Sequence, residues 1–487
     1  MAHYFKGEGR EDEWPLSTPE AQGMDSDFLL RLAARMQASG QDFHGALVLR
    51  NGHLVFEAYR YPYRAGTKHM QASCTKAFTS ALVGIAIKQG YISGADAKVV
   101  DFFPQYQFAH MDGRKKSIRI RHLLSMSSGL DWSQQGDGSH PEAVFLSAAD
   151  PVQYILDRPM AHAPGKVWNY SGGDSHLLSA IVQQVSGRLP FDFAVEHLFE
   201  PLGFSNALWE YHEPTGASIG CAGLYLRPRD MAKLGQLYLN KGKWGKRRIL
   251  SPEWIRASVR RRAGEDYGYK WWLFPQLGMY KAWGFGGEHI AVFPKLNTVV
   301  VFTGGIVDSS VYPLHLELYR EIIAAAKGKK AMPKNPPAHH RLQACAAQAA
   351  KEPVASPHGG LPATARRVSG QRYDMQANSF GFEWFSLDFS EGRQTATLKG
   401  EILFYGFKGT FSVGLDGVYR KKKVAGWKTT LAFRGQWEKG GVFVLDMLNI
   451  DFGYRHSFRL RFRGKRVEVE AASVIEQMRE TLQGRAS

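Results

Sequence analysis

The hydrophobic pattern of this 487-residue chain changes once along its length, and that change limits the folds available to it. Residues 15–327 mix short strand signals with stretches in which apolar residues recur at helical spacing. Residues 365–487 hold short segments of alternating apolar and polar residues, separated by Gly, Asp and Lys. Residues 328–364 are rich in Pro, Lys and His and predict a linker. After an N-terminal extension at 1–14, we therefore expect an α/β (α+β) domain, a linker and an all-β barrel-like domain.

The strand signals of the first domain lie near its two ends. Residues 46–60 predict a hairpin, because Asn51-Gly52 supplies two turn positions that accept positive φ. Residues 288–294 and 298–305 predict two further strands, and helical spacing fills most of the region between the two strand pairs. This order predicts one antiparallel sheet flanked by helices.

Composition argues against several classes of protein. No segment reaches the roughly 18 uncharged apolar residues that cross a bilayer, and the polar N-terminus carries no export signal. The three cysteines, Cys74, Cys221 and Cys345, lack the spacing of a disulfide framework or a zinc site. We therefore expect a cytoplasmic protein with no membrane partner, no metal and no cofactor.

The chain is strongly basic, with a net charge of +17, which raises the question of nucleic-acid binding. Its basic runs, at residues 246–248, 260–262 and 420–423, are short and scattered. They are not interleaved with the aromatic residues that a base-stacking groove requires. We expect a solvated basic surface and no nucleic-acid partner.

Ser73 and Lys76 form the only Ser-x-x-Lys in the chain, at the start of a predicted buried helix over residues 75–89. Residues three apart share a helix face, so a nucleophile and its base would already be neighbours. A helix N-terminus and apolar surroundings both disfavour a protonated lysine, and a neutral lysine can accept the serine proton. The alternative is a capping serine beside a lysine that extends to solvent.

Two later segments carry residues that suit the same chemistry. Tyr170 lies in a loop directly before a predicted helix, from which its phenol could relay a proton to a leaving group. Residues 282–288 are glycine-rich at the start of a strand, where glycine often marks a bulge or the close approach of a ligand. A free N–H there, beside the N–H of Ser73, would form an oxyanion hole.

A competing pattern surrounds Ser218, because Gly216-Ala217-Ser218-Ile219-Gly220 matches the nucleophile elbow of α/β-hydrolases. The residues before it are not a buried strand, and those after it do not begin a helix at once. The context of an elbow is absent, so we expect no catalytic role for Ser218. We also expect structural roles for His122, His162, His176 and His289.

Taken in order, Ser73-x-x-Lys76, Tyr170-Ser171-Gly172 and Trp283-Gly284-Phe285-Gly286-Gly287 resemble the motifs of the β-lactamase-related serine hydrolases. That superfamily includes class C β-lactamases, D-alanyl peptidases, family VIII esterases and 6-aminohexanoate-dimer hydrolases. The likeness covers about residues 15–325, and the remaining β domain is similar to lipocalin-like modules in its strand pattern. The resemblance implies a β-lactamase/transpeptidase-like fold and the catalytic residues Ser73, Lys76 and Tyr170.

Two departures from the family pattern bear on the substrate. Gly172 replaces the asparagine of the family's Tyr-x-Asn, and Ala282 replaces the lysine of its Lys-Thr-Gly in our preferred register. That register makes Phe285 the second oxyanion donor, and a shifted register gives the role to Glu288. An uncharged ester or amide then fits better than a β-lactam. The expected substrate-binding residues are Gly172, Trp283, Gly284, Gly286 and Gly287, with an apolar pocket lined by Trp168, Tyr269, Trp271, Trp272 and Trp283.

The sequence thus predicts a serine hydrolase that forms an acyl-enzyme with a small ester or amide, with a carboxylesterase favoured. An amidase, a peptidase or a weak β-lactamase is the alternative within the same superfamily. A catalytically silent binding or scaffold protein is the alternative from a different class. A small-molecule substrate is the expected partner, together with possible self-assembly through the β domain.

Overall fold

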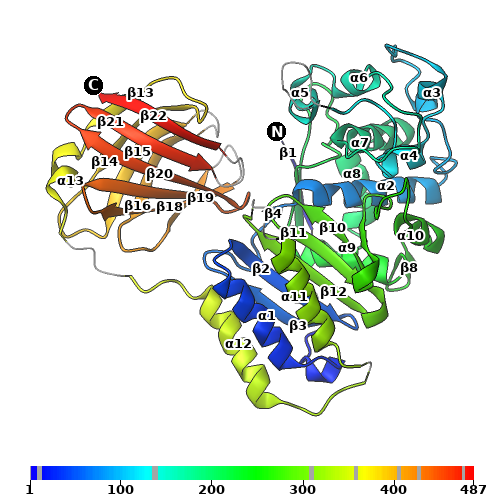
Figure 1. Ribbon diagram of the computed structural model, residues 1–487, viewed down its shortest axis with the longest axis horizontal. Coiled ribbons are helices and arrows are strands. Elements are labelled where there is room, and N and C mark those ends of the chain that lie inside the picture. The colour runs from blue at the N-terminus through cyan, green and yellow to red at the C-terminus, as the bar shows by residue number, and fades with distance from the viewer. Residues whose placement is uncertain are drawn as a thin grey trace.

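The computed structural model of the protein describes residues 2–7, 14–133, 141–306, 312–328, 330–355, 360–402, 407–424, 429–473 and 478–487. These residues form two bodies, a first domain of mixed helices and sheet and a C-terminal β-barrel (Figure 1). The expected combination of a helix-flanked antiparallel sheet with an all-β barrel is confirmed.

The centre of the first domain is a six-stranded antiparallel sheet in the order β3-β2-β12-β11-β10-β9. Asn51 and Gly52, at φ 53° and 77°, form the predicted turn between the first two of these strands in the chain. The predicted pair near residues 288–305 is also present. The strands are β2 (Phe43–Arg50), β3 (His53–Tyr59), β9 (Trp272–Phe274), β10 (Met279–Gly284), β11 (Glu288–Phe293) and β12 (Thr298–Gly304).

Helices cover both faces of this sheet because its strands are apolar on both sides. Leu47 and Leu49 of β2 enter one core, while the alternating Ala46 and Val48 enter another. The first core includes residues of α2 (Thr75–Lys88), α7 (Gly172–Ser186) and α9 (Pro228–Leu239), and the second includes residues of α1 (Ser26–Ala38) and α11 (Tyr312–Ala325).

Most of the remaining helices form a region beside the sheet, where α2 packs against α7 (Figure 1). Residues of α2 are buried continuously from Thr75 to Ala86, as its nearly unbroken apolar surface predicts. The other helices here are α3 (Gly113–Lys116), α4 (Ile120–Leu124), α5 (Pro141–Ser147), α6 (Pro151–Leu156), α8 (Pro190–Ala194) and α10 (Pro252–Ser258).

Residues 2–6, within the expected N-terminal extension at 1–14, are part of the first domain. They form β1 (Ala2–Lys6), which pairs with β5 (Asn206–Glu210) at the edge of a small sheet. The order of this sheet is β1-β5-β6-β4, and it also contains β4 (His69–Met70) and β6 (Leu224–Leu226). Phe5 packs against the main core of the domain and so holds this short strand in place.

The expected linker at residues 328–364 contains a helix that belongs to the first domain. Helix α12 (Pro336–Ala350) packs on α1 and β3, and it buries Ala338 and Leu342. Its prolines occupy the first turn, where a missing N–H costs no helical hydrogen bond. The content of Pro, Lys and His did not reveal this helix, because packing on distant elements stabilises it.

The barrel is a ten-stranded antiparallel sheet, β16-β15-β14-β13-β22-β21-β20-β19-β18-β17, closed by a pairing of β16 with β18. Its described interior is packed with side chains, many of them aromatic, such as Phe385, Phe443 and Phe458. The short helix α13 (Ala363–Val368) precedes it. The strands are β13 (Arg372–Met375), β14 (Phe382–Asp388), β15 (Thr395–Ile402), β16 (Phe407–Gly414), β17 (Arg420–Val424), β18 (Thr429–Glu438), β19 (Val442–Asn449), β20 (Tyr454–Arg463), β21 (Arg466–Ser473) and β22 (Met478–Ala486).

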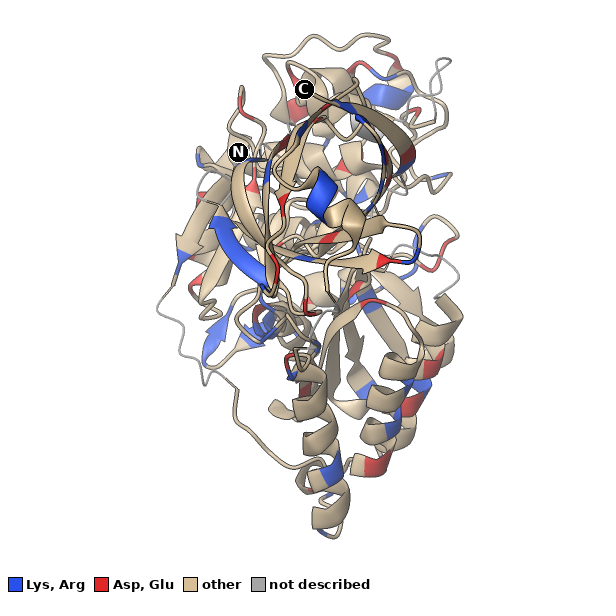
Figure 2. Ribbon diagram, turned by 90° about the vertical axis from the view of Figure 1, so that its left-hand side faces the viewer, with Lys and Arg blue, Asp and Glu red and all other residues tan. Residues whose placement is uncertain are grey.

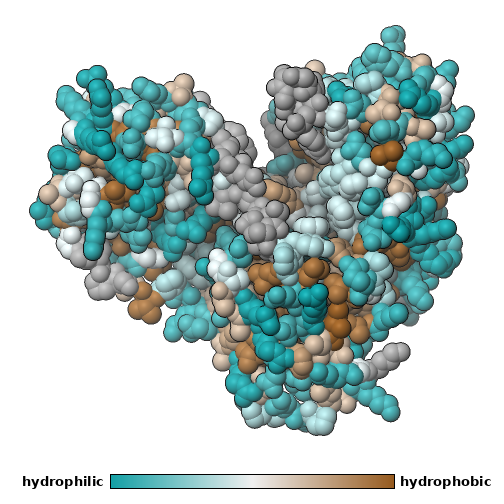
Figure 3. Space-filling view, in the orientation of Figure 1, coloured by the Kyte–Doolittle hydropathy of each residue, from teal (hydrophilic) through white to brown (hydrophobic). Residues whose placement is uncertain are grey.

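Lys and Arg are interspersed with Asp and Glu along the ribbons of both bodies (Figure 2). A notch separates the barrel from the helical region in the space-filling view (Figure 3). The basic run at 246–248 lies beside and within the small hairpin of β7 (Lys243–Trp244) and β8 (Arg247–Arg248), and the run at 420–423 lies in β17. No helix in the described parts of the chain is long and apolar enough to span a membrane.

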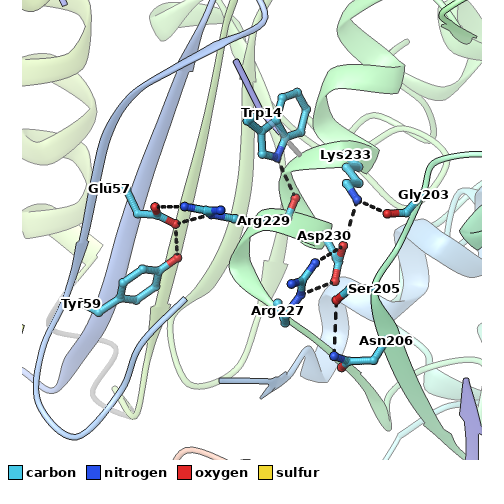
Figure 4. A network of polar contacts seen from close by, with 10 residues as sticks. All are labelled: Trp14, Glu57, Tyr59, Gly203, Ser205, Asn206, Arg227, Arg229, Asp230 and Lys233. Carbon is cyan, nitrogen blue, oxygen red and sulfur yellow. Dashed lines mark hydrogen bonds and ion pairs between the residues drawn. The ribbon is translucent and has the colours of Figure 1, made fainter. Parts of the chain in front are cut away.

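Ion pairs attach α9 to the sheet (Figure 4). Arg229 at the start of α9 donates to both carboxylate oxygens of Glu57 on β3, at 2.9 and 2.7 Å. The fully buried Asp230 accepts from Arg227 at 2.9 Å and from Lys233 at 3.1 Å. Burying a carboxylate is costly unless cations pair with it, so these contacts keep the N-terminal turn of α9 in one position.

Lys281, within strand β10, is a fully buried lysine. Its ammonium lies 4.0 Å from the ring centre of Trp283 and 3.5 Å from Nε2 of His289. Burial in these surroundings lowers the pKa of Lys281 to about 7.

We predict that Lys281→Met stabilises the protein and weakens the pH dependence of its stability. Between about pH 7 and pH 10.5 the unfolded chain holds a proton that folded Lys281 has released, so the free energy of unfolding rises with pH. Below pH 7 the folded protein bears the full cost of burying a charged lysine. Lys281→Met should therefore raise the free energy of unfolding by roughly 1 to 4 kcal/mol in this pH range. Denaturant unfolding between pH 6 and 10 measures both effects. A variant with the wild-type slope would contradict the prediction.

Candidate active site

Ser73 lies in a short 3₁₀ turn, η2 (Ala72–Cys74), that continues directly into α2. Lys76 follows one helical turn later, and its Nζ donates to Oγ of Ser73 at 2.8 Å. The same Nζ donates to the carbonyl oxygen of Cys221 at 3.0 Å, and Lys76 is 3% exposed. The lysine does not extend to solvent. The structure therefore places the predicted nucleophile and base in direct contact.

Tyr170 lies beside this pair, as the sequence predicts. Its ring centre is 4.9 Å from Nζ of Lys76, and both Tyr170 and Ser73 line one cavity. The ring also packs against Trp168 and Trp272, with centroid distances of 6.1 and 6.0 Å. Three segments that are distant in the sequence thus converge at one place.

The loop that carries Tyr170 is held through Met126, which the sequence reading did not single out. The carbonyl oxygen of Met126 accepts from the N–H of Asn169 at 2.8 Å, and its Sδ accepts from the N–H of Ser171 at 3.4 Å. The buried Lys270 also donates to this Sδ, at 3.2 Å, and burial lowers the pKa of Lys270 to about 7. Both peptide neighbours of Tyr170 are therefore anchored on one residue.

Gly172 does not lie in the cavity wall. It is the buried first residue of α7, whose N-cap Ser171 accepts from the N–H of Asp174 at 3.0 Å. The expected role of Gly172 in substrate binding finds no support in this position, because the helix start faces the protein interior.

The glycine-rich segment follows β10 and passes close to the backbone that precedes Ser73. A Cβ at Gly284 would lie 2.4 Å from the carbonyl oxygen of Gln71, so only glycine fits there. Gly286 and Gly287 adopt φ values of 101° and 91°, which glycine tolerates and other residues rarely do. The N–H of Ile306 donates to the carbonyl oxygen of Gly286 at 2.9 Å.

The two candidate oxyanion donors differ in their surroundings. Phe285 is 50% exposed and lines the cavity, whereas Glu288 is 3% exposed and lies in the β-ladder opposite Gly284. Burial raises the pKa of Glu288 well above its usual range, and its carbonyl oxygen accepts from Sγ of Cys74 at 3.2 Å. Only the Phe285 position opens on the space beside Ser73.

The cavity has a volume of about 920 Å³ and a wall made largely of aromatic and apolar side chains. Three of the five aromatic residues predicted to line it do so. Tyr269 and Trp271 are instead buried in the core, against Trp254 and Tyr238. The described lining consists of Ser73, Trp168, Tyr170, Glu265, Asp266, Trp272, Leu273, Phe274, Gln276, Trp283, Gly284, Phe285, Gly286, Gly287, Ile306, Tyr312 and His315.

The charged residues of this wall are acidic. Glu265 and Asp266 line the cavity, and no Lys or Arg is among its described lining residues, although the chain carries a net charge of +17. Asp266 pairs with Arg261 at 3.3 Å. A substrate carboxylate would therefore find no cation in the described wall to receive it.

Ser218 has none of the features of a nucleophile. It is fully buried, outside the cavity, and its carbonyl oxygen accepts from Oγ of Ser179 at 2.9 Å. The elbow pattern around it is a sequence coincidence. His289 is likewise buried, with its Nδ1 2.7 Å from the hydroxyl of Tyr319.

Comparison with known proteins agrees with this geometry. Residues 31–304 match the Beta-lactamase family. The chain is 22% identical over 282 residues to the 6-aminohexanoate-dimer hydrolase of Paenarthrobacter ureafaciens, covering 52% of this chain and 70% of that protein. It is 30% identical over 189 residues to esterase EstB of Burkholderia gladioli, covering 35% of this chain and 47% of the esterase. The match thus spans about half the length of EstB.

Solved structures show the same fold at low sequence identity. A putative 6-aminohexanoate-dimer hydrolase from Bacillus anthracis superposes with a TM-score of 0.56 at 18% identity, covering 69% of this chain and 92% of that one. A putative beta-lactamase from Bacteroides dorei superposes with a TM-score of 0.53 at 18% identity, covering 63% of this chain and all of the other. The chain belongs to the beta-lactamase family and is a serine hydrolase of that fold with a C-terminal β-barrel.

Proposed function

We propose that the protein is a carboxylesterase that hydrolyses small uncharged esters through an acyl-enzyme on Ser73. The observation that carries the proposal is the 2.8 Å contact between Ser73 and the buried Lys76, at a cavity whose described wall has no Lys or Arg. Lys76 is 3% exposed and contacts the serine hydroxyl, and a lysine in its neutral form can take the serine proton. Ser73 attacks the carbonyl carbon while Lys76 accepts its proton.

Tyr170 completes the proton path in this proposal. Its ring lies 4.9 Å from Nζ of Lys76, close to the space in which a leaving group would depart from Ser73. The phenol passes the proton to the leaving alcohol, and water then releases the acyl group by the reverse path. No metal or cofactor takes part in these steps.

The N–H groups of Ser73 and Phe285 bind the oxyanion. Phe285 is preferred over Glu288 because it lines the cavity, while Glu288 is buried in the ladder with β10. Trp283, Gly284, Gly286 and Gly287 bound the same space and contact the substrate. Backbone donors held in place before the reaction stabilise the charge that develops in the transition state.

Amide hydrolysis is the second candidate, because one relative of the chain is named for the hydrolysis of an amide dimer. Ester hydrolysis is favoured by the 30% identity to an esterase and by the absence of a cation for a substrate carboxylate in the described wall. Cytoplasmic location, self-assembly through the barrel and the absence of nucleic-acid or membrane partners stay predictions of the sequence.

We predict that Ser73→Ala abolishes labelling by a fluorophosphonate probe and lowers p-nitrophenyl ester hydrolysis at least a thousandfold, because the nucleophile is lost. The matched control is Ser218→Ala, which should label and turn over like wild type. A labelled and active Ser73→Ala variant would show that another residue is the nucleophile. An unlabelled wild type that is fully folded would support the silent scaffold instead.

Tyr170→Phe should lower kcat by a factor of about 10² to 10⁴ with little change in melting temperature, since only a proton-relaying hydroxyl is removed. Tyr106→Phe, which removes a phenol hydroxyl outside the cavity, serves as the control and should retain kcat. Stopped-flow or steady-state ester kinetics measure kcat for both variants. A Tyr170→Phe enzyme with wild-type kcat would remove Tyr170 from the mechanism.

A substrate series tests the expected ester preference. We predict that p-nitrophenyl butyrate exceeds p-nitrophenyl hemisuccinate in kcat/KM by about 5- to 150-fold, because an unpaired carboxylate in an apolar cavity costs about 1 to 3 kcal/mol. A linear anilide and nitrocefin should turn over more slowly than the butyrate. Rapid turnover of nitrocefin, which carries a carboxylate, would overturn this ranking.

A further inference from the structure

The turn between β19 and β20, at residues 450–453, is one of the places where the barrel meets the first domain. Ile450 and Leu448 enclose Tyr63 of the first domain in a small apolar cluster together with Ala432. This places one tip of the barrel against the small sheet and the end of β12.

The first contact is with β4, the strand that directly precedes Ser73 in the chain, and with its partner strand β6. The ring of Phe452 packs edge-on against Tyr225 of β6 at 4.9 Å, and the hydroxyl of Tyr454 donates to Sδ of Met70 at 3.4 Å. Met70 and Tyr225 are partners across the β4–β6 ladder. Ser73 follows Met70 by three residues, so the barrel touches the segment that sets the position of its N–H.

The second contact is with the segment that holds the glycine-rich turn. A Cβ at Gly305 would lie 2.9 Å from the carbonyl oxygen of Gly453, and a Cβ at Gly453 would lie 3.4 Å from that of Gly304. Side chains also lie at this contact, because the same Cβ positions would be 2.9 Å from Oδ2 of Asp42 and 3.1 Å from Cε1 of His44. The two glycine-containing segments are therefore close neighbours, packed together beside Asp42 and His44. The next residue, Ile306, donates its N–H to Gly286, which adjoins Phe285.

The interface also carries charge. Asp42 of the first domain lies between His44, Arg60 and the barrel's Arg455. Burial alone would raise the pKa of this carboxyl, but the attraction of these three groups lowers it to about 2. The carboxylate is thus ionised at neutral pH and attracts the barrel across the interface.

We propose that the β19–β20 turn is a positioning element of the active site, bracing the two backbone segments that supply the oxyanion-binding N–H groups of Ser73 and Phe285. The inference rests on the proposed function and extends it to the barrel. The two donors come from separate parts of the chain, and their mutual placement must be held to about 0.5 Å for full effect. One barrel turn that touches both segments limits their relative movement.

The turn acts on the transition state and not on substrate binding. Oxyanion donors strengthen their hydrogen bonds as charge develops, so a loosened brace lowers kcat while KM changes little. Loss of a whole donor costs about 10² to 10³ in kcat, and a displaced donor costs less. We expect a decrease of about tenfold.

The test replaces Phe452 by alanine in the full-length protein and follows p-nitrophenyl butyrate hydrolysis. We expect kcat, corrected for active sites by burst titration, to fall about tenfold with KM within twofold, and the rate of fluorophosphonate labelling to fall in parallel. The control is Trp384→Ala on β14, four strands away from β20 in the order of the barrel sheet, which should stay within twofold of wild type.

Two further variants test the same contact in case Phe452→Ala does not fold. Phe452→Leu keeps apolar volume but loses the ring contact. Gly305→Ala inserts a methyl group from the other side, 2.9 Å from both the carbonyl oxygen of Gly453 and Oδ2 of Asp42. Each should show the same loss of kcat. Folded variants with wild-type kcat, or with a raised KM at unchanged kcat, would overturn the inference. If Ser73→Ala stays active in the same assay, the proposed function fails instead.

Discussion

The contact between Ser73 and Lys76 at the start of a buried helix is the constraint on which the rest of the structure depends. One helical turn fixes the separation of the hydroxyl and the amine, and the apolar surroundings of α2 remove the lysine from solvent. The carbonyl oxygen of Cys221 is a second acceptor for the amine, so Lys76 is held between two oxygens. Other elements bring their groups to this pair, Tyr170 from the loop before α7 and the glycine-rich turn from β10.

That arrangement requires buried positive charge, which a fold tolerates only at some cost in stability. Lys270 supports the loop of Tyr170 through Met126, and Lys281 lies beneath Trp283 in the cavity wall. Burial lowers the pKa of both to about 7, so each weakens the folded state at neutral pH. A protein retains such residues where position matters more than stability. Lys281 contacts Trp283 of the cavity wall, and Lys270 supports the loop of Tyr170 through Met126.

Much of this could be anticipated from local pattern, and the failures have a common cause. The Asn51-Gly52 hairpin, the buried α2 and most barrel strands carry signals in adjacent residues, which is why they were predictable. Helix α12 and strand β1 were missed because they are stabilised by packing on distant elements. Trp271 was predicted to line the cavity because the residue type alone does not distinguish a tryptophan that lines a pocket from one that lies in the core.

The sequence by itself determined the chemistry, because Ser73 and Lys76 are near neighbours whose relation is set by helix geometry alone. Tertiary structure decided which segments that are far apart in the sequence contact one another. It brought Tyr170 to Lys76, placed Phe285 and not Glu288 in the cavity wall, and set the barrel turn against the strands that flank Ser73. Local rules act over a few residues, whereas these contacts join positions far apart in the sequence, and only the packing of the whole chain fixes them.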